Sequence, residues 1–299
     1  MSKITFLFLV IFYLLLTLFA GGVSLSTFQE MQVCLFFVLI LGIPHGAIDN
    51  ILYLSKHKIS KLRFYTIYLA IIALNVLFWL WLPSLALLSF LLLSAYHFGQ
   101  SQFTNYFQKE PIGLAMFYIV WGIALLSGLV YFNIEATYQL LLTIDGLATP
   151  AKIQLTLATQ WILIATASLT LLTLLFFGIK RYLPWEKILL EGILFLLMQV
   201  SFFLFPLLIG FTLYFIVLHS IKVLQDEYRY LIAQKIVRSL QNFVKLLLPL
   251  SLVSIVGVLL IFGLIYLQWI PISYVFAFLI LISSITVPHA YVMKVFYKA

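Results

Sequence analysis

The segment Leu41-Gly-Ile-Pro-His-Gly-Ala-Ile-Asp-Asn50 lies inside an apolar run yet carries a histidine and a carboxylate. Side chains four residues apart point to nearly the same side of an α-helix, so the spacing predicts that His45 and Asp49 are neighbours. Ionisable groups are costly in hydrocarbon and usually mark function there. The pair is typical of a metal ligand and the carboxylate that orients it. A buried His–Asp pair that merely joins two helices is the structural alternative.

The composition around this stretch is that of a membrane protein. Of the 299 residues, 65% are hydrophobic and 9% are charged, whereas a soluble domain has about 25% charged residues. Apolar runs of about 20 residues, long enough to cross a bilayer, recur along the chain. The sequence therefore predicts an all-α, polytopic transmembrane helix bundle that forms one transmembrane domain over residues 1–299.

About ten spans are expected, with boundaries uncertain by several residues. They cover residues 4–21, 30–53, 64–82, 84–105, 112–132, 158–178, 187–205, 208–225, 244–267 and 271–293. Pro83 and Pro271 are expected at tight turns between spans, and Pro206 with Gly210 is expected to separate the seventh span from the eighth. The longest external connection is expected at residues 137–154, and a charged loop with some helical character at residues 224–245.

The distribution of basic residues predicts the orientation. If the N-terminus is cytoplasmic, these ten spans place every Lys and Arg except Lys152 on the cytoplasmic side, as the positive-inside rule requires. Both termini are then cytoplasmic in a multi-pass protein of the cell inner membrane. The first apolar run is expected to remain as a helix and not to be cleaved as a signal peptide. The net charge of +8 then reflects topology and does not indicate nucleic-acid binding.

Four of the five histidines lie within predicted spans, and all four spans run from outside to inside. The charge distribution places His45, His97, His219 and His289 in the cytoplasmic halves of spans two, four, eight and ten. Neutral imidazole is a common ligand of iron, copper, zinc and nickel. We therefore expect these four rings to meet around one metal ion near the inner leaflet. His57, in the basic segment 55–58, is expected to be a solvated loop residue.

Residues near these histidines add further expectations. Gln100 lies three residues after His97 and so beside it on the helix face. Gly46 and Gly99 follow histidines closely, where a missing side chain lets another helix or a ligand approach, although ordinary helix packing uses glycine in the same way. Glu191 could pair with a histidine, but a carboxylate that reaches the membrane interface is the expectation. The single cysteine, Cys34, cannot form an internal disulfide.

Four motifs together resemble a known family. Pro44-His-Gly-Ala-Ile-Asp49, Tyr96-His-Phe-Gly99, Leu218-His-Ser220 and Pro288-His289 are similar, in order and spacing, to motifs of the Brp/Blh family of bacterial membrane β-carotene 15,15′-dioxygenases. The resemblance implies a non-haem Fe(II) enzyme that uses O₂ to split β-carotene at its central double bond into two molecules of retinal. It also implies that His45, His97 and His219 are iron ligands, with Asp49 beside them.

The chain departs from this family at one expected ligand. Many members have a second histidine four residues after that of the HS motif, where this chain has Val223. The fourth ligand is then absent, or it is His289 or water. Some members also have an acid after the HFG motif, where this chain has glutamines.

The substrate implied by the resemblance is a long hydrocarbon dissolved in the bilayer. A lateral opening between helices, lined by Phe, Tyr and Trp, is therefore expected, although core packing and interfacial belts explain most of the 17% aromatic content. Two other functions fit the histidines: a b-type haem protein with axial histidines, and a transporter in which His45 and Asp49 relay protons. A histidine-box desaturase or hydroxylase fits less well, because its HxxxH and HxxHH spacings are missing.

Overall fold

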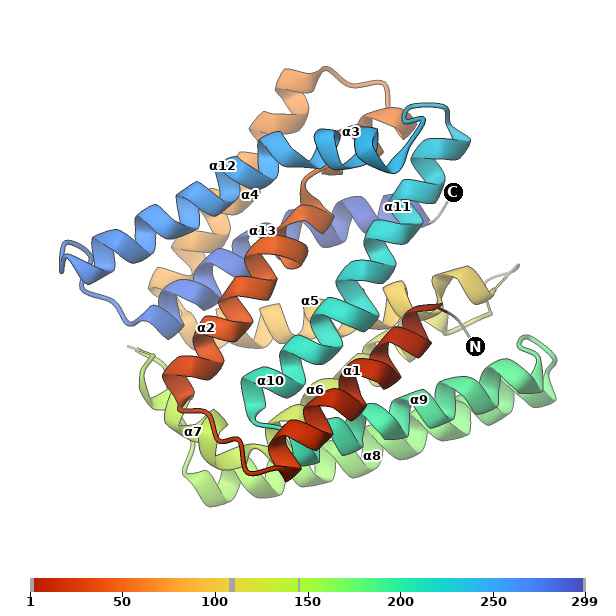
Figure 1. Cartoon of the computed structure of the whole chain (residues 1–299), viewed down its shortest axis with the longest axis vertical. Helices are drawn as coiled ribbons and strands as arrows, with labels where there is room; N and C mark the ends of the chain where they lie inside the picture. Colours follow the sequence, from red (N-terminus) through yellow and green to blue (C-terminus); the bar gives the residue numbers. More distant parts are fainter. Residues whose placement is uncertain (1–2, 108–110, 145, 298–299) are drawn as a thin grey trace. The chain divides into compact units, whose positions relative to one another are not determined.

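A computed structural model describes residues 3–107, 111–144 and 146–297, and all regular structure within these ranges is helical (Figure 1). The α-helices are α1 (Lys3–Ala20), α2 (Thr27–Phe37), α3 (Asp49–Lys56), α4 (Lys61–Trp81), α5 (Pro83–Phe103), α6 (Leu114–Phe132), α7 (Ile134–Leu142), α8 (Lys152–Ile179), α9 (Trp185–Leu204), α10 (Leu207–Leu213), α11 (Ile221–Ala233), α12 (Leu240–Tyr266) and α13 (Tyr274–Tyr297). The 3₁₀ and π segments are η1 (Val38–Gly42), η2 (Ile43–Gly46), η3 (Thr104–Tyr106) and η4 (Tyr214–Ser220). The predicted polytopic, all-α class is confirmed.

Within the described ranges, nine helical stretches are long and apolar enough to cross a membrane. They are Lys3–Ala20, Thr27–Lys56, Lys61–Trp81, Leu114–Phe132, Lys152–Ile179, Trp185–Leu204, Leu207–Ala233, Leu240–Tyr266 and Tyr274–Tyr297. Each matches one of the predicted spans. The remaining predicted span corresponds to α5, which has sufficient length but a polar second half, Tyr96-His-Phe-Gly-Gln-Ser-Gln102. That polar half lowers its hydropathy, and it also carries His97.

The breaks predicted at the three prolines are confirmed, whereas Gly210, expected to act with Pro206, lies inside α10. Pro83 begins α5 two residues after α4 ends, Pro206 separates α9 from α10, and Pro271 lies between α12 and α13. Proline lacks the N–H that continues a helix, which explains all three positions. The connection expected at residues 137–154 is partly helical, because α7 continues to Leu142. The orientation in the membrane stays a prediction, and Lys109 and Lys298, which contribute to it, lie outside the described residues.

The chain packs into two compact units. The first unit consists of the residues up to Val38, Ala95–Tyr138 and Pro150–Lys222. The second unit consists of Leu39–Ser94, Gln139–Thr149 and the residues from Val223 onward. The prediction of one transmembrane domain stays a prediction.

The first unit is built around α6, which packs against α8 and α9. Buried aromatic and small residues of α6, among them Phe117, Trp121 and Ala124, form this core. The segment of α5 that belongs to this unit crosses α6 at very short range. A Cβ on Gly99 would lie 2.6 Å from the Tyr118 Cα, and a Cβ on Gly122 would overlap the Ala95 backbone. Glycine at both positions therefore permits the crossing that positions His97.

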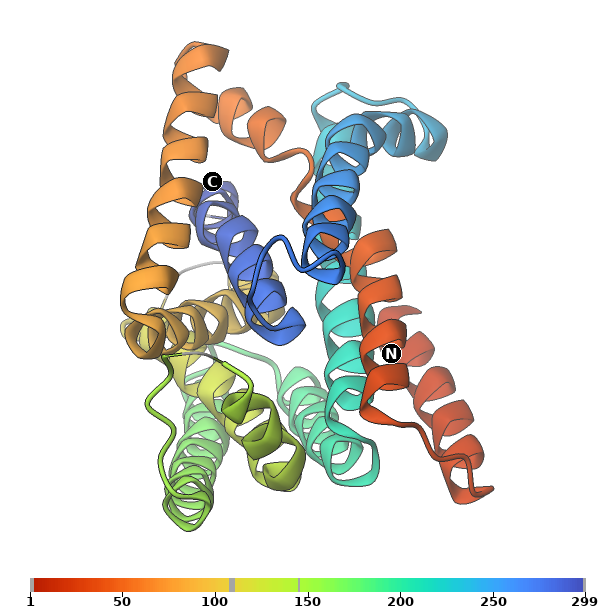
Figure 2. The same cartoon turned by 90° about the vertical axis from the view of Figure 1, so that its left-hand side faces the viewer.

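The second unit is built around α13, which packs against α4, α3 and α12; Figure 2 shows α13, in dark blue, beside α4, in orange. Its core includes Leu52, Val223 and Met293, all almost completely buried. Polar contacts join the same helices, because the Trp79 indole and the Asn75 amide of α4 donate hydrogen bonds to the Ser283 hydroxyl of α13 over 2.7 and 3.0 Å. This packing fixes the helix that carries His289.

Candidate metal centre

The segment around His45 is not an α-helix, contrary to the prediction for residues 41–50. The chain passes from the π segment η1 into the 3₁₀ segment η2, then through a turn, and α3 begins only at Asp49. Pro44 stands near the start of η2, and its missing N–H interrupts the α-helical hydrogen-bond ladder. Departures of this kind often occur at functional sites. The expectation that His45 and Asp49 are related by one α-helical turn is therefore wrong.

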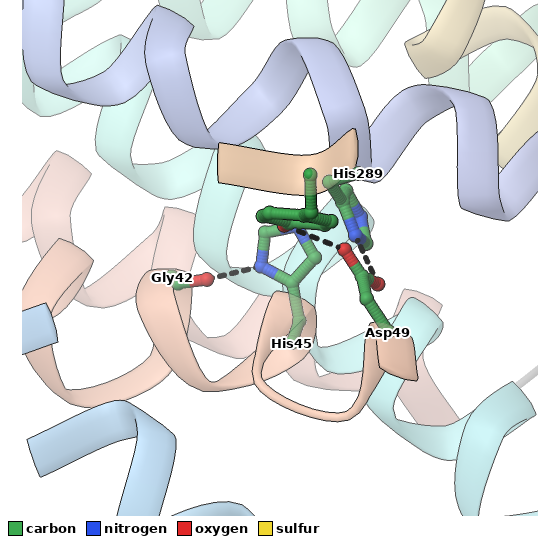
Figure 3. A network of polar contacts seen from close by, with 5 residues as sticks. Gly42, His45, Asp49 and His289 are labelled. Carbon is green, nitrogen blue, oxygen red and sulfur yellow. Dashed lines mark hydrogen bonds and ion pairs between the residues drawn. The ribbon is translucent and has the colours of Figure 1, made fainter. Parts of the chain in front are cut away.

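The His45 ring is held by its own local backbone. Its Nδ1 donates a hydrogen bond to the carbonyl oxygen of Gly42, three residues earlier (Figure 3). A carbonyl oxygen only accepts hydrogen bonds, so Nδ1 carries the proton and Nε2 carries the lone pair. Neutral imidazole in this tautomer can ligate a metal through Nε2.

Asp49 holds a different histidine from the one predicted. His289 Nδ1 donates a hydrogen bond to Asp49 Oδ1 over 2.8 Å (Figure 3). The Tyr68 hydroxyl donates to Asp49 Oδ2 over 2.9 Å. The sequence predicted that Asp49 orients His45; the hydrogen bond instead goes to α13, because the turn before α3 redirects the carboxylate. A carboxylate that accepts from Nδ1–H is the usual outer partner of a metal-ligating histidine.

His45 and His289 form an edge-to-face pair of imidazoles within the second unit. Their ring centroids lie 4.7 Å apart with an interplanar angle of 85°, and the residues are 8% and 2% exposed. Gly46 lies beside the His289 ring, but a Cβ there would lie 3.4 Å from His289 Nδ1, an ordinary van der Waals distance. The predicted need for glycine at position 46, to admit another helix beside a histidine, therefore stays a prediction.

The first unit holds a second pair, His97 of α5 and His219 of η4. Their ring centroids lie 4.9 Å apart with an interplanar angle of 81°, and each residue is 1% exposed. His219 lies in the π segment η4, and the π segment η1 directly precedes the 3₁₀ segment that contains His45. Both segments depart from α-helical geometry. The Phe215 ring stacks on the His219 ring with centroids 5.5 Å apart and restricts its rotation.

The His219 tautomer follows from its contact with Ser101. Ser101 Oγ lies 3.0 Å from His219 Nδ1 and also donates a hydrogen bond to the Phe98 carbonyl oxygen over 3.0 Å. A hydroxyl has one proton, so Ser101 Oγ accepts from His219 Nδ1–H when it donates to Phe98. His219 then has the same tautomer as His45 and His289, with the lone pair on Nε2.

Glu191 does not reach the membrane interface as predicted. It is 2% exposed and accepts hydrogen bonds from Tyr106 Oη over 2.6 Å and from Gln102 Nε2 over 2.8 Å. Burial and the neighbouring carboxylate raise the pKa of Tyr106, which therefore remains a donor. The network joins α9 to the end of α5, so it supports the helix that carries His97.

Several residues of the site were not recognisable from the sequence. Tyr68 and Ser101 contact Asp49 and His219, but a single Tyr or Ser in an apolar helix gives no distinctive signal. Glu227 is completely buried in α11, on the same helix face as Val223 and Leu231; its position in a segment expected to be a charged loop concealed this. Gln100, predicted to lie beside His97 on the helix face, is buried. His57 is an exposed residue just after α3 ends, as predicted for a loop residue, and its ring is tilted against Tyr53.

The chemistry of these side chains suits a divalent transition metal. Each unit supplies two buried imidazoles, and the Nδ1 contacts of three of them direct the Nε2 lone pair outward for ligation. The buried carboxylate of Asp49 contacts the His45–His289 pair. Val223 is packed in the apolar core of the second unit, so this position supplies no ligand.

A comparison with protein families identifies the chain. A family model described as beta-carotene 15,15′-dioxygenase matches residues 36–297, which include all four of these histidines. Searches of the curated proteins and of the solved structures found no significant match. The family suggests a dioxygenase that acts on carotenoids, in agreement with the motifs around the histidines. This chain belongs to the beta-carotene 15,15′-dioxygenase family.

Proposed function

We propose that this protein is an Fe(II)-dependent dioxygenase that cleaves β-carotene, or a related carotenoid, at its central 15,15′ double bond to give retinal. The family match over residues 36–297 is the observation that carries this proposal. We further propose that His45, His97, His219 and His289 ligate one Fe(II) ion in a bacterial inner membrane. His289 takes the place of the ligand that Val223 does not supply.

The donor set fits this metal. Imidazole suits iron, whereas the described residues around these histidines offer no thiolate that would favour a soft metal. Neutral histidines leave a net positive charge on a bound Fe(II), and a low-dielectric surrounding makes that charge costly. The Asp49 carboxylate, 3% exposed, offsets part of it through His289.

When bound, Fe(II) supplies the electrons and the open coordination position that O₂ chemistry requires. The chain's own residues have simpler tasks. Gly42 and Ser101 hold the His45 and His219 rings in one tautomer, and Asp49 does the same for His289. Burial of all four rings excludes water, which protects a reduced metal and an oxidation-sensitive polyene from side reactions.

Production of retinal tests this proposal most simply. Bacteria that make β-carotene and express this chain should lose carotene and accumulate retinal, measured by chromatography. Unchanged carotene in cells that contain well-folded protein would reject the proposal. The same purified protein should contain iron and lack the Soret absorption of haem, which separates this function from a b-type haem protein. Proton-coupled uptake into vesicles would instead support a transporter.

A further inference from the structure

The second unit contains a long apolar groove that ends beside the segment carrying His45. One wall is formed by η1 and Pro44, and the other walls are formed by α11 and α12. Its volume is about 530 Å³, within the range of about 300–1,000 Å³ that is usual for small-molecule sites. We call this space the α11–α12 groove.

The groove is elongated along α12. The residues of α12 that line it recur every three or four positions from Leu240 to Ile255, which corresponds to about 22 Å of helix at 1.5 Å per residue. A stripe of this length suits a linear hydrocarbon better than a compact ligand. Among the described residues, none with a charged side chain lines the groove, and Gln225, Tyr228 and Ser251 are the only lining residues with polar side-chain atoms. This largely apolar lining suits a hydrocarbon better than the charged headgroup of a phospholipid.

The groove comes nearest in the sequence to the candidate metal centre at Pro44. Pro44, which lines it, immediately precedes His45, and α12 packs against η2, which contains both residues. The groove therefore reaches the residue that adjoins His45 in the sequence. His45 is also the most exposed of the four histidines, at 8%.

The groove is open on the side that faces lipid. Ile40 on one wall and Val244, Leu248 and Leu252 on α12 are 45–53% exposed, although all are apolar. They lie in stretches long and apolar enough to cross a membrane. A hydrocarbon dissolved in the bilayer could pass between these side chains without crossing a polar layer.

We propose that the α11–α12 groove is the lateral access route and binding site for one arm of a carotenoid polyene, an inference that rests on the proposed function. The polyene lies along α12, and its centre approaches the metal centre past Pro44. Leu248 and Ser251 contact the chain of the substrate, and Tyr228 covers it from α11.

Filling the groove tests this proposal. Leu248→Trp and Ser251→Trp place an indole in the groove, whereas Val253→Trp places the same indole on an exposed position of α12 outside it, since Val253 is 68% exposed. Ser251→Leu adds less bulk and provides a second variant if the tryptophan variants do not accumulate. Each purified protein is titrated with β-carotene in nanodiscs without O₂, so that binding is read from the shift of the carotene absorption while no cleavage occurs. Iron content is measured in parallel.

The groove-filling variants should bind carotene about tenfold or more weakly, with unchanged iron content, because the added bulk must displace the ligand or the helices. Val253→Trp should bind carotene as the unchanged protein does. Equal carotene binding by all the variants would overturn the assignment. This holds also if the groove-filling variants lose a co-purified lipid, because the groove would then be a lipid site. Failure of the proposed function is a separate result. The protein would then bind carotene in the groove but would contain no iron and form no retinal.

Discussion

His289 and Asp49, which are 240 residues apart in the sequence, are joined by a hydrogen bond of 2.8 Å from Nδ1 to Oδ1. Both residues are almost completely buried, and Tyr68 occupies the other carboxylate oxygen. This contact closes α13 onto the start of α3 and fixes one tautomer of His289.

Asp49→Asn should reduce iron affinity while the protein still folds. The amide preserves the shape of the side chain but removes the negative charge that His289 Nδ1–H contacts. Loss of such an outer partner typically costs roughly 10–100-fold in metal affinity or activity. Titration of iron into chelator-treated protein measures the effect. Tyr68→Phe, which removes only the second hydrogen bond to Asp49, should have the smaller effect; the reverse order would contradict the role given to the charge.

Ser101→Ala should loosen the His219 ring and lower iron retention moderately. The variant removes the Oγ atom that lies 3.0 Å from His219 Nδ1. Ser101→Thr retains a hydroxyl and should restore most of the iron content. A purely structural role for Ser101 would instead lower the melting temperature of Ser101→Ala without changing the iron bound per folded chain.

His289→Ala should lose iron to the same extent as His45→Ala if His289 is a ligand. His57→Ala is the matched control, because His57 lies in the loop after α3 and its ring contacts Tyr53. The control should keep full iron and full retinal production. Normal iron content in His289→Ala would remove this residue from the metal centre and return the fourth position to water.

Gly99→Ala should destabilise the protein strongly because α5 and α6 cannot separate without losing their packing. The new Cβ would lie 2.6 Å from the Tyr118 Cα, and overpacking of this kind costs about 1–3 kcal/mol or more. Gly192→Ala in α9 is the control, because nothing lies within 4 Å of its added Cβ. Thermal unfolding in detergent should show a lower melting temperature for Gly99→Ala only.

The sequence predicted the helices better than the contacts between them. Hydropathy located the spans, and Pro83, Pro206 and Pro271 marked their breaks, because both signals are local. The partner of Asp49 was predicted wrongly, since Pro44 replaces the expected α-helix with a 3₁₀ segment and the carboxylate then meets a helix far along the chain. The prediction that Glu191 lies at the interface was also wrong. Its contacts with Gln102 and Tyr106 depend on tertiary packing, which the sequence does not show.

Gly46 and Gly99 show the intermediate case. Their positions after histidines suggested close approach, and the structure places the His289 ring against Gly46 and the Tyr118 backbone against Gly99. The sequence could not say which helix would approach, because that choice is made by the packing of α13 and α6. The motifs also could not predict which histidines pair, namely His45 with His289 and His97 with His219.

The iron content of the purified protein shows whether all four histidines hold one iron ion. Four single variants, His45→Ala, His97→Ala, His219→Ala and His289→Ala, are compared with the unchanged chain by elemental analysis, and circular dichroism verifies that each is folded. The unchanged chain should hold iron in stoichiometric amount, and each folded variant should lose most of it. Full iron retention in the variants of either pair would contradict a single iron centre built from all four histidines.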